Sequence, residues 1–257
     1  MFPGNALIPI RDDNPTKNRS VVVLALIGLN IIFFFLEPQL GSGNSCRLFA
    51  FLYKWGVVPI EVLAGRALTG TIPELVPGQG TACAGVFLQS KSIMFSLFSS
   101  MFLHGGFLHL GGNMLFLWVF GNNIEDTLGK ARFIVFYLLT GVLAGLAHVY
   151  TNPTSIVPTI GASGAVAGIL GAYIVLFPRA RVTSVVPIFI FLHFMRIPAA
   201  AFLGIWFVFQ LLTGGSQQAG GGGVAWMAHV GGFIAGAILI LAFGGLRRRH
   251  RGPELLA

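Results

Sequence analysis

The chain has 257 residues, of which 55% are hydrophobic and only 9% are charged. About 25% of the residues of an ordinary soluble domain are charged, so this composition excludes such a domain and predicts an integral membrane protein. The net charge of +8 does not indicate a nucleic-acid-binding protein, because the basic residues flank apolar runs and are not interleaved with aromatic residues.

Six apolar runs of helical length are expected to cross the membrane. The first covers residues 21–36 and follows Lys17 and Arg19, which is also the pattern of a signal peptide. No small-x-small cleavage motif comes after it, so we interpret it as the first span. The remaining spans are expected at about residues 102–120, 133–150, 161–177, 199–212 and 225–243.

The segments between these runs define the expected organisation. A long mixed loop covers about residues 37–92, a short polar loop covers 121–132, and a glycine-rich loop covers 213–223. Residues 185–194 are apolar but short, so they are expected to lie at the interface or to re-enter the membrane. We therefore expect an all-α, polytopic six-transmembrane-helix bundle over residues 21–243, with an N-terminal tail (1–20) and a basic C-terminal tail (244–257).

The distribution of basic residues predicts the orientation, because cytoplasmic loops carry more Lys and Arg than outward ones. Six spans place both termini on one side, together with Arg11, Lys17, Arg19, Lys130, Arg132, Arg179, Arg181, Arg196 and the cluster 247–251. The other side holds only Arg47, Lys54, Arg66 and Lys91, all in the long loop. Both termini are thus expected in the cytoplasm, and the bacterial inner membrane is expected because no organelle transit peptide is apparent.

The two cysteines, Cys46 and Cys83, both fall in the long outward loop. Neither belongs to a CxxC pair, so a zinc site is not predicted. A disulfide between them and two free thiols both remain open, because an outward loop permits oxidation without requiring it.

Polar side chains inside membrane spans are costly and therefore indicate function. His109 and Asn113 lie four residues apart on one face of the second span, Ser163 lies in the fourth span and His229 in the sixth. All three spans enter from the outer side, so these residues are expected in one layer roughly 5–15 Å below that surface. The spans hold no Asp or Glu and the chain has no HExxH motif, which excludes an aspartyl protease, a carboxylate relay and a zinc metalloprotease.

Small residues predict close contact between the fourth and sixth spans. Gly161, Gly164 and Gly168 give the fourth span a smooth face, and Gly232 and Gly236 form a GxxxG pattern in the sixth. Small residues at this spacing let membrane helices approach closely, and packing alone is the alternative reading. Such an approach would bring the His229 imidazole within hydrogen-bond reach of the Ser163 hydroxyl.

A serine and a histidine in this arrangement predict nucleophilic catalysis. A serine hydroxyl becomes a useful nucleophile when a base takes its proton, and His229 could do so and later protonate the leaving amine. No Asp is available for a triad, so a Ser163–His229 dyad is expected. The backbone amide of Ser163 and the side chains of Asn113 and His109 are the candidate donors to the oxyanion.

Three motifs occur in order along the chain: HGGFLHLGGN (104–113), GASG (161–164) and AHVGGFIAG (228–236). With these motifs the sequence resembles the rhomboid family of intramembrane serine proteases. The segments GNNIEDTLG (121–129) and FPRARV (177–182) also resemble that family. The resemblance implies a six-helix bundle whose site opens outward, with Ser163 as nucleophile, His229 as base and Asn113 and His109 at the oxyanion. It also implies transmembrane segments of single-pass proteins as substrates within the lipid bilayer, with no cofactor, metal or nucleic acid.

Some positions depart from the family pattern or keep a structural reading. Some members have an aromatic residue where this chain has Ala167, so His229 must be oriented by something else. Phe202 and Trp206 are candidate gate residues, with lipid-facing packing as the alternative. His104 and His148 are expected to be structural, and a transporter and an inactive rhomboid-like binding protein are the rival functions.

Overall fold

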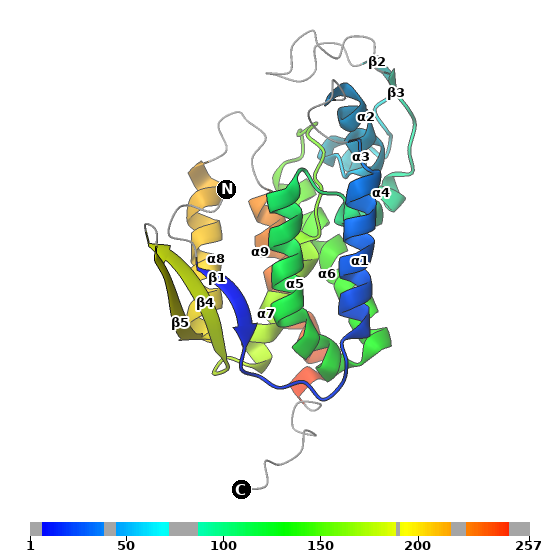
Figure 1. Cartoon of the computed structure of the whole chain (residues 1–257). Coiled ribbons are helices and arrows are strands. Elements are labelled where there is room, and N and C mark those ends of the chain that lie inside the picture. The colour runs from blue at the N-terminus through cyan, green and yellow to red at the C-terminus, as the bar shows by residue number, and fades with distance from the viewer. Residues whose placement is uncertain (1–6, 39–44, 72–86, 189–190, 217–224, 247–257) are drawn as a thin grey trace, which may run out of the picture.

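The computed structural model describes residues 7–38, 45–71, 87–188, 191–216 and 225–246. A bundle of apolar helices with a small sheet on one side makes up most of the molecule (Figure 1). The bundle helices are α1 (Val21–Leu36), α5 (Phe107–Leu128), α6 (Lys130–Thr151), α7 (Ser163–Leu176), α8 (Ala199–Ser216) and α9 (Trp226–Ala242). The smaller elements are α2 (Ser45–Trp55), α3 (Pro59–Ala64), α4 (Ile93–Ser99), the 3₁₀ turn η2 (Ser100–Phe102), and the strands β1 (Ile8–Asp12), β2 (Gly70–Thr71), β3 (Phe87–Leu88), β4 (Arg181–Ile188) and β5 (Phe191–Pro198).

The exposed surface of the bundle is apolar, as a lipid environment requires. Phe35, Trp118 and Ile238, on three different helices, each expose more than half of their side-chain surface, and surface of this kind would be costly in water. Among the described helices, α6 alone is both long and apolar enough to cross a membrane by itself, while α1, α7, α9 and residues 199–212 of α8 are shorter apolar helices. These features agree with the expected helical membrane bundle.

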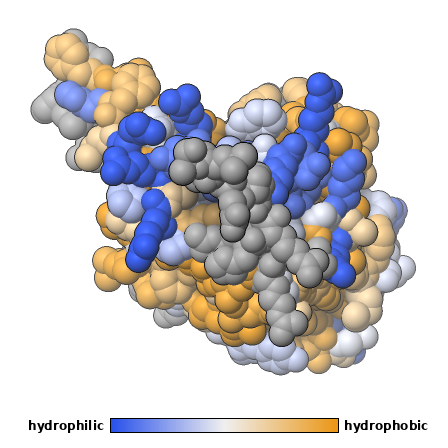
Figure 2. Space-filling model, turned by 90° about the horizontal axis from the view of Figure 1, so that it is seen from below, coloured by the Kyte–Doolittle hydropathy of each residue, from blue (hydrophilic) through white to orange (hydrophobic). Residues whose placement is uncertain are grey.

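The two ends of the bundle differ. The end that carries α2, α3 and α4, here called the cap end, lies opposite the Gly129 turn between α5 and α6, here called the turn end (Figure 1). Seen from the turn end, hydrophilic residues gather on this face beside a largely hydrophobic flank (Figure 2). The exposed basic residues near the turn end include Lys17, Arg19, Lys130, Arg132, Arg179 and Arg181.

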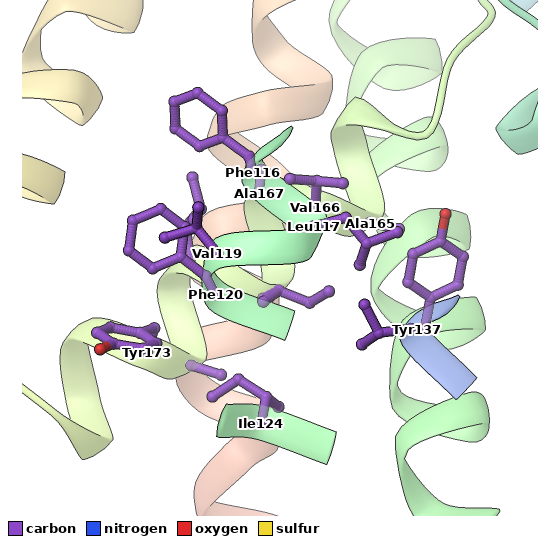
Figure 3. Packing of buried hydrophobic residues seen from close by; sticks show 14 of the residues in the cluster. Phe116, Leu117, Val119, Phe120, Ile124, Tyr137, Ala165, Val166, Ala167 and Tyr173 are labelled. Atoms are coloured by element: carbon purple, nitrogen blue, oxygen red, sulfur yellow. The ribbon is translucent and has the colours of Figure 1, made fainter. Parts of the chain in front are cut away.

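The core lies where α5, α6 and α7 pack against one another. Phe116 and Phe120 of α5, Tyr137 of α6 and Tyr173 of α7 point into it (Figure 3) and are almost completely buried. The rings of Phe120 and Tyr173 meet edge to face at a centroid distance of 5.0 Å, which is a favourable geometry for aromatic pairs. This core holds α7 in the centre of the bundle.

Glycines set the distance between α7 and α9. A Cβ atom added to Gly236 would overlap the carbonyl oxygen of Gly168, and one added to Gly232 would overlap that of Gly164. Gly164 also faces α6, because its Cβ would lie 2.6 Å from that of Ala144. The three helices therefore approach to backbone contact, which only small residues permit.

The expected polar loop at residues 121–132 is wrong. Helix α5 continues to Leu128, and the connection to α6 is reduced to Gly129, whose φ of +77° suits glycine. The helix continues because its polar residues find partners on the N-terminal segment. The Glu125 carboxylate accepts hydrogen bonds from the backbone amides of Val22 and Val23, and so caps α1 at its N-terminus.

The second expected span also begins differently. Residues 93–102 form α4 and η2, and the chain then bends by 84° before α5 starts at Phe107. His104 consequently lies in the bend and not inside a helix. The bend brings the residues before α5 against the start of α7, since the Gly161 amide donates to the carbonyl oxygen of Ser100 at 2.8 Å.

The described part of residues 185–194, expected as an interfacial or re-entrant piece, belongs to two paired strands. Strands β4 and β5 pair antiparallel from Arg181↔Pro198 to Ile188↔Phe191, and β1 pairs with the other edge of β4. Their β-branched and aromatic residues favour strands. Because β1 comes from the expected N-terminal tail, the described part of residues 1–20 is folded onto the bundle (Figure 1).

The long segment before α4 is held together by buried polar contacts of its own. Lys91 pairs with Glu61 of α3, and its ammonium also donates to the carbonyl oxygens of Tyr53 and Gly56 at 2.7 and 2.8 Å. Burial lowers the pKa of Lys91, although Glu61 opposes this effect. Cys46 in α2 is disulfide-bonded, while Cys83 lies outside the described residues.

Gly236→Ala should destabilise the protein, because the added methyl group would force α9 away from Gly168. Overpacking of this kind costs about 1–3 kcal/mol. Gly28→Ala in α1 is the matched control, because no atom lies within 4 Å of its Cβ position. The thermal midpoint in mild detergent should fall for the first variant only, and an equal effect of both would contradict the close crossing.

Asp12 should make stability depend on pH. Its carboxylate accepts from the Tyr173 hydroxyl and from the Asn123 amide, yet burial dominates and raises the pKa of Asp12 from 3.8 to about 6. The folded state thus binds this proton more tightly than the unfolded state, so stability is greatest below pH 4 and falls as the pH rises through 6. From pH 7 to pH 5, the wild type should gain about 1 kcal/mol relative to Asp12→Asn in denaturant titrations. An identical pH dependence of both proteins would contradict this assignment.

Candidate active site

Ser163 is the first residue of α7 and is half-buried. The 14 residues of α7 rise by about 21 Å, whereas the hydrocarbon core of a bilayer is about 30 Å thick. Helix α7 is therefore shorter than the hydrocarbon core, and its first residue places the serine hydroxyl at the positive end of a helix dipole.

The loop before Ser163 is fixed by backbone hydrogen bonds to the cap end. The amides of Val57 and Thr159 donate to each other's carbonyl oxygens at 3.1 and 2.7 Å, and Gly161 is bonded to Ser100. These contacts hold the two residues Thr159 and Gly161, which come shortly before α7. Ser163 is thus presented by a rigid turn.

Gly161 brings His109 and Ser163 together. Its φ is +120°, a conformation that residues with a Cβ rarely adopt. A Cβ at this position would lie 2.8 Å from Nε2 of His109 and 3.6 Å from Oγ of Ser163. Only glycine therefore leaves room for the imidazole beside the serine. Gly161 takes no part in the α7–α9 crossing, so helix packing does not explain why a glycine is needed here.

The protonation of His109 follows from its contacts. The Gly105 amide donates to Nδ1 of His109 across a long hydrogen bond of 3.4 Å. Because Nδ1 acts as the acceptor, the neutral ring carries its proton on Nε2. That N–H is on the edge of the ring closest to Gly161, and so it can serve as a donor next to Ser163.

Asn113 lies one turn further along α5, on the same face as His109. It is buried, and its amide nitrogen Nδ2 has no hydrogen-bond partner among the described residues. Buried polar atoms are nearly always satisfied, so an unpaired donor calls for an explanation. A donor held ready for an oxygen of a bound molecule is such an explanation.

His229 is the fourth residue of α9 and is buried. It follows Ala228, whose carbonyl oxygen would lie 3.8 Å from a Cβ on Gly164, the residue next to Ser163. The α7–α9 crossing thus places Ser163 and His229 on neighbouring turns of two touching helices. The hydrogen bonds found in the described part of the chain do not include one between the two side chains.

Gln210 of α8 was not identified from the sequence. Its Oε1 lies 2.9 Å from Nδ1 of His229. Trp206, one turn earlier on α8, places its ring 6.2 Å from the imidazole at an interplanar angle of 36°. The sequence did offer a signal, because Gln210 is the single amide side chain within the apolar run 199–212. A polar side chain inside a membrane span indicates function, whether it is a glutamine or a histidine.

His104 supports the site from the bend before α5. Its ring packs against His109 at a centroid distance of 5.1 Å, and its amide donates to the Glu37 carboxylate at 2.9 Å. Burial at the end of α1 raises the pKa of Glu37 to about 7. His148 bonds within its own turn, where Nδ1 lies 3.4 Å from the amide nitrogen of Asn152.

The two candidate gate residues differ in exposure. Phe202 is 2% exposed and stacks on Phe120 at a centroid distance of 6.0 Å, which joins α8 to α5. The lipid-facing alternative is therefore wrong for Phe202. Trp206 is partly buried and contacts His229 and Phe233. Within the described residues, no group of three His, Cys, Asp or Glu side chains could hold a metal ion.

Comparison with known proteins identifies the family. The Rhomboid domain matches residues 91–245, more than half of the chain. Rhomboid protein 1, mitochondrial, of Saccharomyces cerevisiae is 34% identical over 152 residues, which cover 56% of this chain and 40% of that protein. Putative rhomboid protease YdcA of Bacillus subtilis is 37% identical over 78 residues (30% of this chain, 39% of that protein), and Rhomboid protease GluP of the same organism is 40% identical over 76 residues (30% and 14%).

The aligned segments span less than half the length of each of these relatives. The relatives come from mitochondria as well as bacteria, so they do not support the expected bacterial inner membrane over other membranes. The matched residues 91–245 include α5, α7 and α9, which carry His109, Asn113, Ser163 and His229. This match, on an apolar helical bundle, shows that the chain is an integral membrane protein and belongs to the rhomboid family.

Proposed function

We propose that the protein is an intramembrane serine endopeptidase in which Ser163 is the nucleophile and His229 the general base. The observation that carries this proposal is the glycine crossing of α7 and α9, which places these two residues on neighbouring turns. Membership of the rhomboid family supports it, since two of the relatives are named as proteases. A partly exposed serine beside a buried histidine also suits attack on an incoming peptide.

The reaction follows from the two side chains. Oγ of Ser163 attacks the scissile carbonyl carbon while Nε2 of His229 takes the hydroxyl proton. The tetrahedral intermediate collapses when the imidazolium gives that proton to the leaving amine, which leaves an acyl-enzyme. Water then attacks the ester with His229 as base, and the released Ser163 oxygen regains its proton from the imidazolium.

The oxyanion is stabilised by donors that surround Gly161. These are the Nε2–H of His109 and the backbone amide of Ser163 at the helix start. The unpaired Nδ2 of Asn113, one turn beyond His109 on α5, is the third donor proposed. Donors held in place before the reaction need no reorganisation as charge develops, and one such donor typically contributes about 100–1000-fold in rate.

The substrates proposed are transmembrane segments of single-pass membrane proteins. A site below the cap-end surface would reach a peptide bond in or near the membrane, provided that the segment there is extended and not helical. The exposed basic residues of the turn end support a cytoplasmic position for that end under the positive-inside rule. Both termini would then be cytoplasmic, with residues 21–243 as the membrane domain and residues 1–20 and 244–257 as its flanking tails.

Ser163→Ala and His229→Ala should each reduce cleavage of a transmembrane substrate in liposomes by at least about 1000-fold, because the dyad acts as a unit. Ser163→Ala should also lose covalent labelling by a fluorophosphonate probe. Ser184→Ala, at a buried serine of β4, and His193→Ala, at an exposed histidine of β5, are the matched controls and should behave as wild type. Labelling or cleavage by folded Ser163→Ala would refute the assignment, as would an inert but folded wild type.

Gly161→Ala should lower cleavage by roughly tenfold or more, because the methyl group would need a strained backbone and would displace His109. Gly105→Ala, in the bend before α5, is the matched control, since its Cβ would meet nothing closer than an Ile160 methyl group at 3.9 Å. Rates should be measured with the liposome assay and the folded fraction by thermal unfolding. Equal rates for the two variants would show that the His109 position does not matter.

A further inference from the structure

One polar contact links α8 to the proposed dyad. Oε1 of Gln210 lies 2.9 Å from Nδ1 of His229, and both residues are shielded from solvent at least in part. We propose that Gln210 is a positioning residue that holds the Nδ1–H of His229, so that Nε2 faces Ser163 as the proton acceptor. This inference rests on the proposed function, since it assigns the residue that prepares the base of that same site.

The hydrogen bond selects one tautomer of the imidazole. In a neutral ring one nitrogen carries a proton and the other is an acceptor. When Nδ1–H donates to the glutamine oxygen, the lone pair is on Nε2, where a serine proton can be taken. The reverse arrangement, in which the glutamine NH₂ donates to Nδ1, would put the proton on Nε2 and leave the base unusable.

The side chain can only orient the base. A glutamine amide does not take up a proton at neutral pH, so Gln210 remains an acceptor before and after His229 becomes an imidazolium. In the charged ring Nδ1–H still donates to Oε1, and the bond becomes stronger because its donor is then ionised. The proton that moves is the one on Oγ of Ser163, and it goes to Nε2.

Two residues of α8 fix the plane of the ring. Gln210 and Trp206 are four residues apart, so they lie on the same face of α8 and both meet His229. The residue of α7 one turn after Ser163 is the buried Ala167, whose methyl group can neither stack on an imidazole nor accept a hydrogen bond. The imidazole is therefore oriented from α8, and the alignment of the dyad depends on how α8 packs against α9.

The packing of α8 on α9 is mainly aromatic outside this contact. Phe207 meets Phe233 at a centroid distance of 4.7 Å, and Trp206 meets the same ring at 6.1 Å. These apolar contacts hold the helix in place but cannot select a tautomer. Replacement of Gln210 by leucine should therefore keep α8 in position and remove only the acceptor.

The test combines kinetics with nitrogen-15 NMR of histidine-labelled protein in detergent. The variants are Gln210→Leu, which has no acceptor, Gln210→Glu, which keeps one, and the matched control Gln89→Leu at an exposed glutamine far along the chain. The His229 ring signals are assigned by their absence in His229→Ala. The NMR measurement needs no turnover, so it tests the role of Gln210 separately from the proteolysis itself.

We expect wild-type His229 to show a protonated Nδ1 and an unprotonated Nε2, and Gln210→Leu to lose this preference. Its kcat in liposomes should fall roughly 10–100-fold with KM changed less than about twofold, since the substrate does not touch Gln210. Gln210→Glu should restore kcat to within about threefold of wild type, and Gln89→Leu should match it. A wild-type ring protonated on Nε2, or a folded Gln210→Leu with wild-type kcat, would overturn the proposal. A protein with the expected tautomer but no cleavage would refute the proposed function alone.

Discussion

Backbone contact between α7 and α9 is the constraint on which the site depends. Gly164 and Gly168 on one helix face Gly232 and Gly236 on the other, so closely that an added Cβ would overlap a carbonyl oxygen. In lipid, apolar side chains gain little from meeting one another, so shape decides which helices associate. The same smooth surfaces that stabilise the crossing bring the start of α7 near the start of α9, so that Ser163 and His229 lie on neighbouring turns.

The polar groups around this crossing divide into two kinds. Those that complete helix ends are satisfied, as Glu125 shows where it caps α1. The others include Asn113 of α5, whose buried amide keeps a free donor at Nδ2. An unpaired buried donor carries a desolvation cost, and it is not unique to this place, since the buried Ser184 of β4 has no partner within the described part of the chain either. What distinguishes Asn113 is its position one turn from His109 on the same face of α5.

Helix α8 differs from the other bundle helices in the contacts it makes. Phe202, near its start, is anchored against Phe120, and Trp206 and Gln210, one and two turns further along, contact His229. The helix therefore joins α5, at one side of the bundle, to the base at its centre. A displacement of its cap-end half would separate Gln210 from His229 while the α7–α9 crossing stayed intact, so assembly of the site involves two separable contacts.

Local composition determined much of this protein. Apolar runs of helical length indicated the six bundle helices, and the costs of polar side chains in lipid selected His109, Asn113, Ser163 and His229 for attention before their positions were known. Tertiary structure alone decided the rest. Residues 121–128 are helical because Glu125 has amides to cap, β4 lies between β5 and β1 because the N-terminal segment returns to its free edge, and Gln210 contacts a histidine 19 residues away. Such partners lie far apart along the chain, and a periodic pattern reports only on the environment of a segment and not on the atoms it will meet.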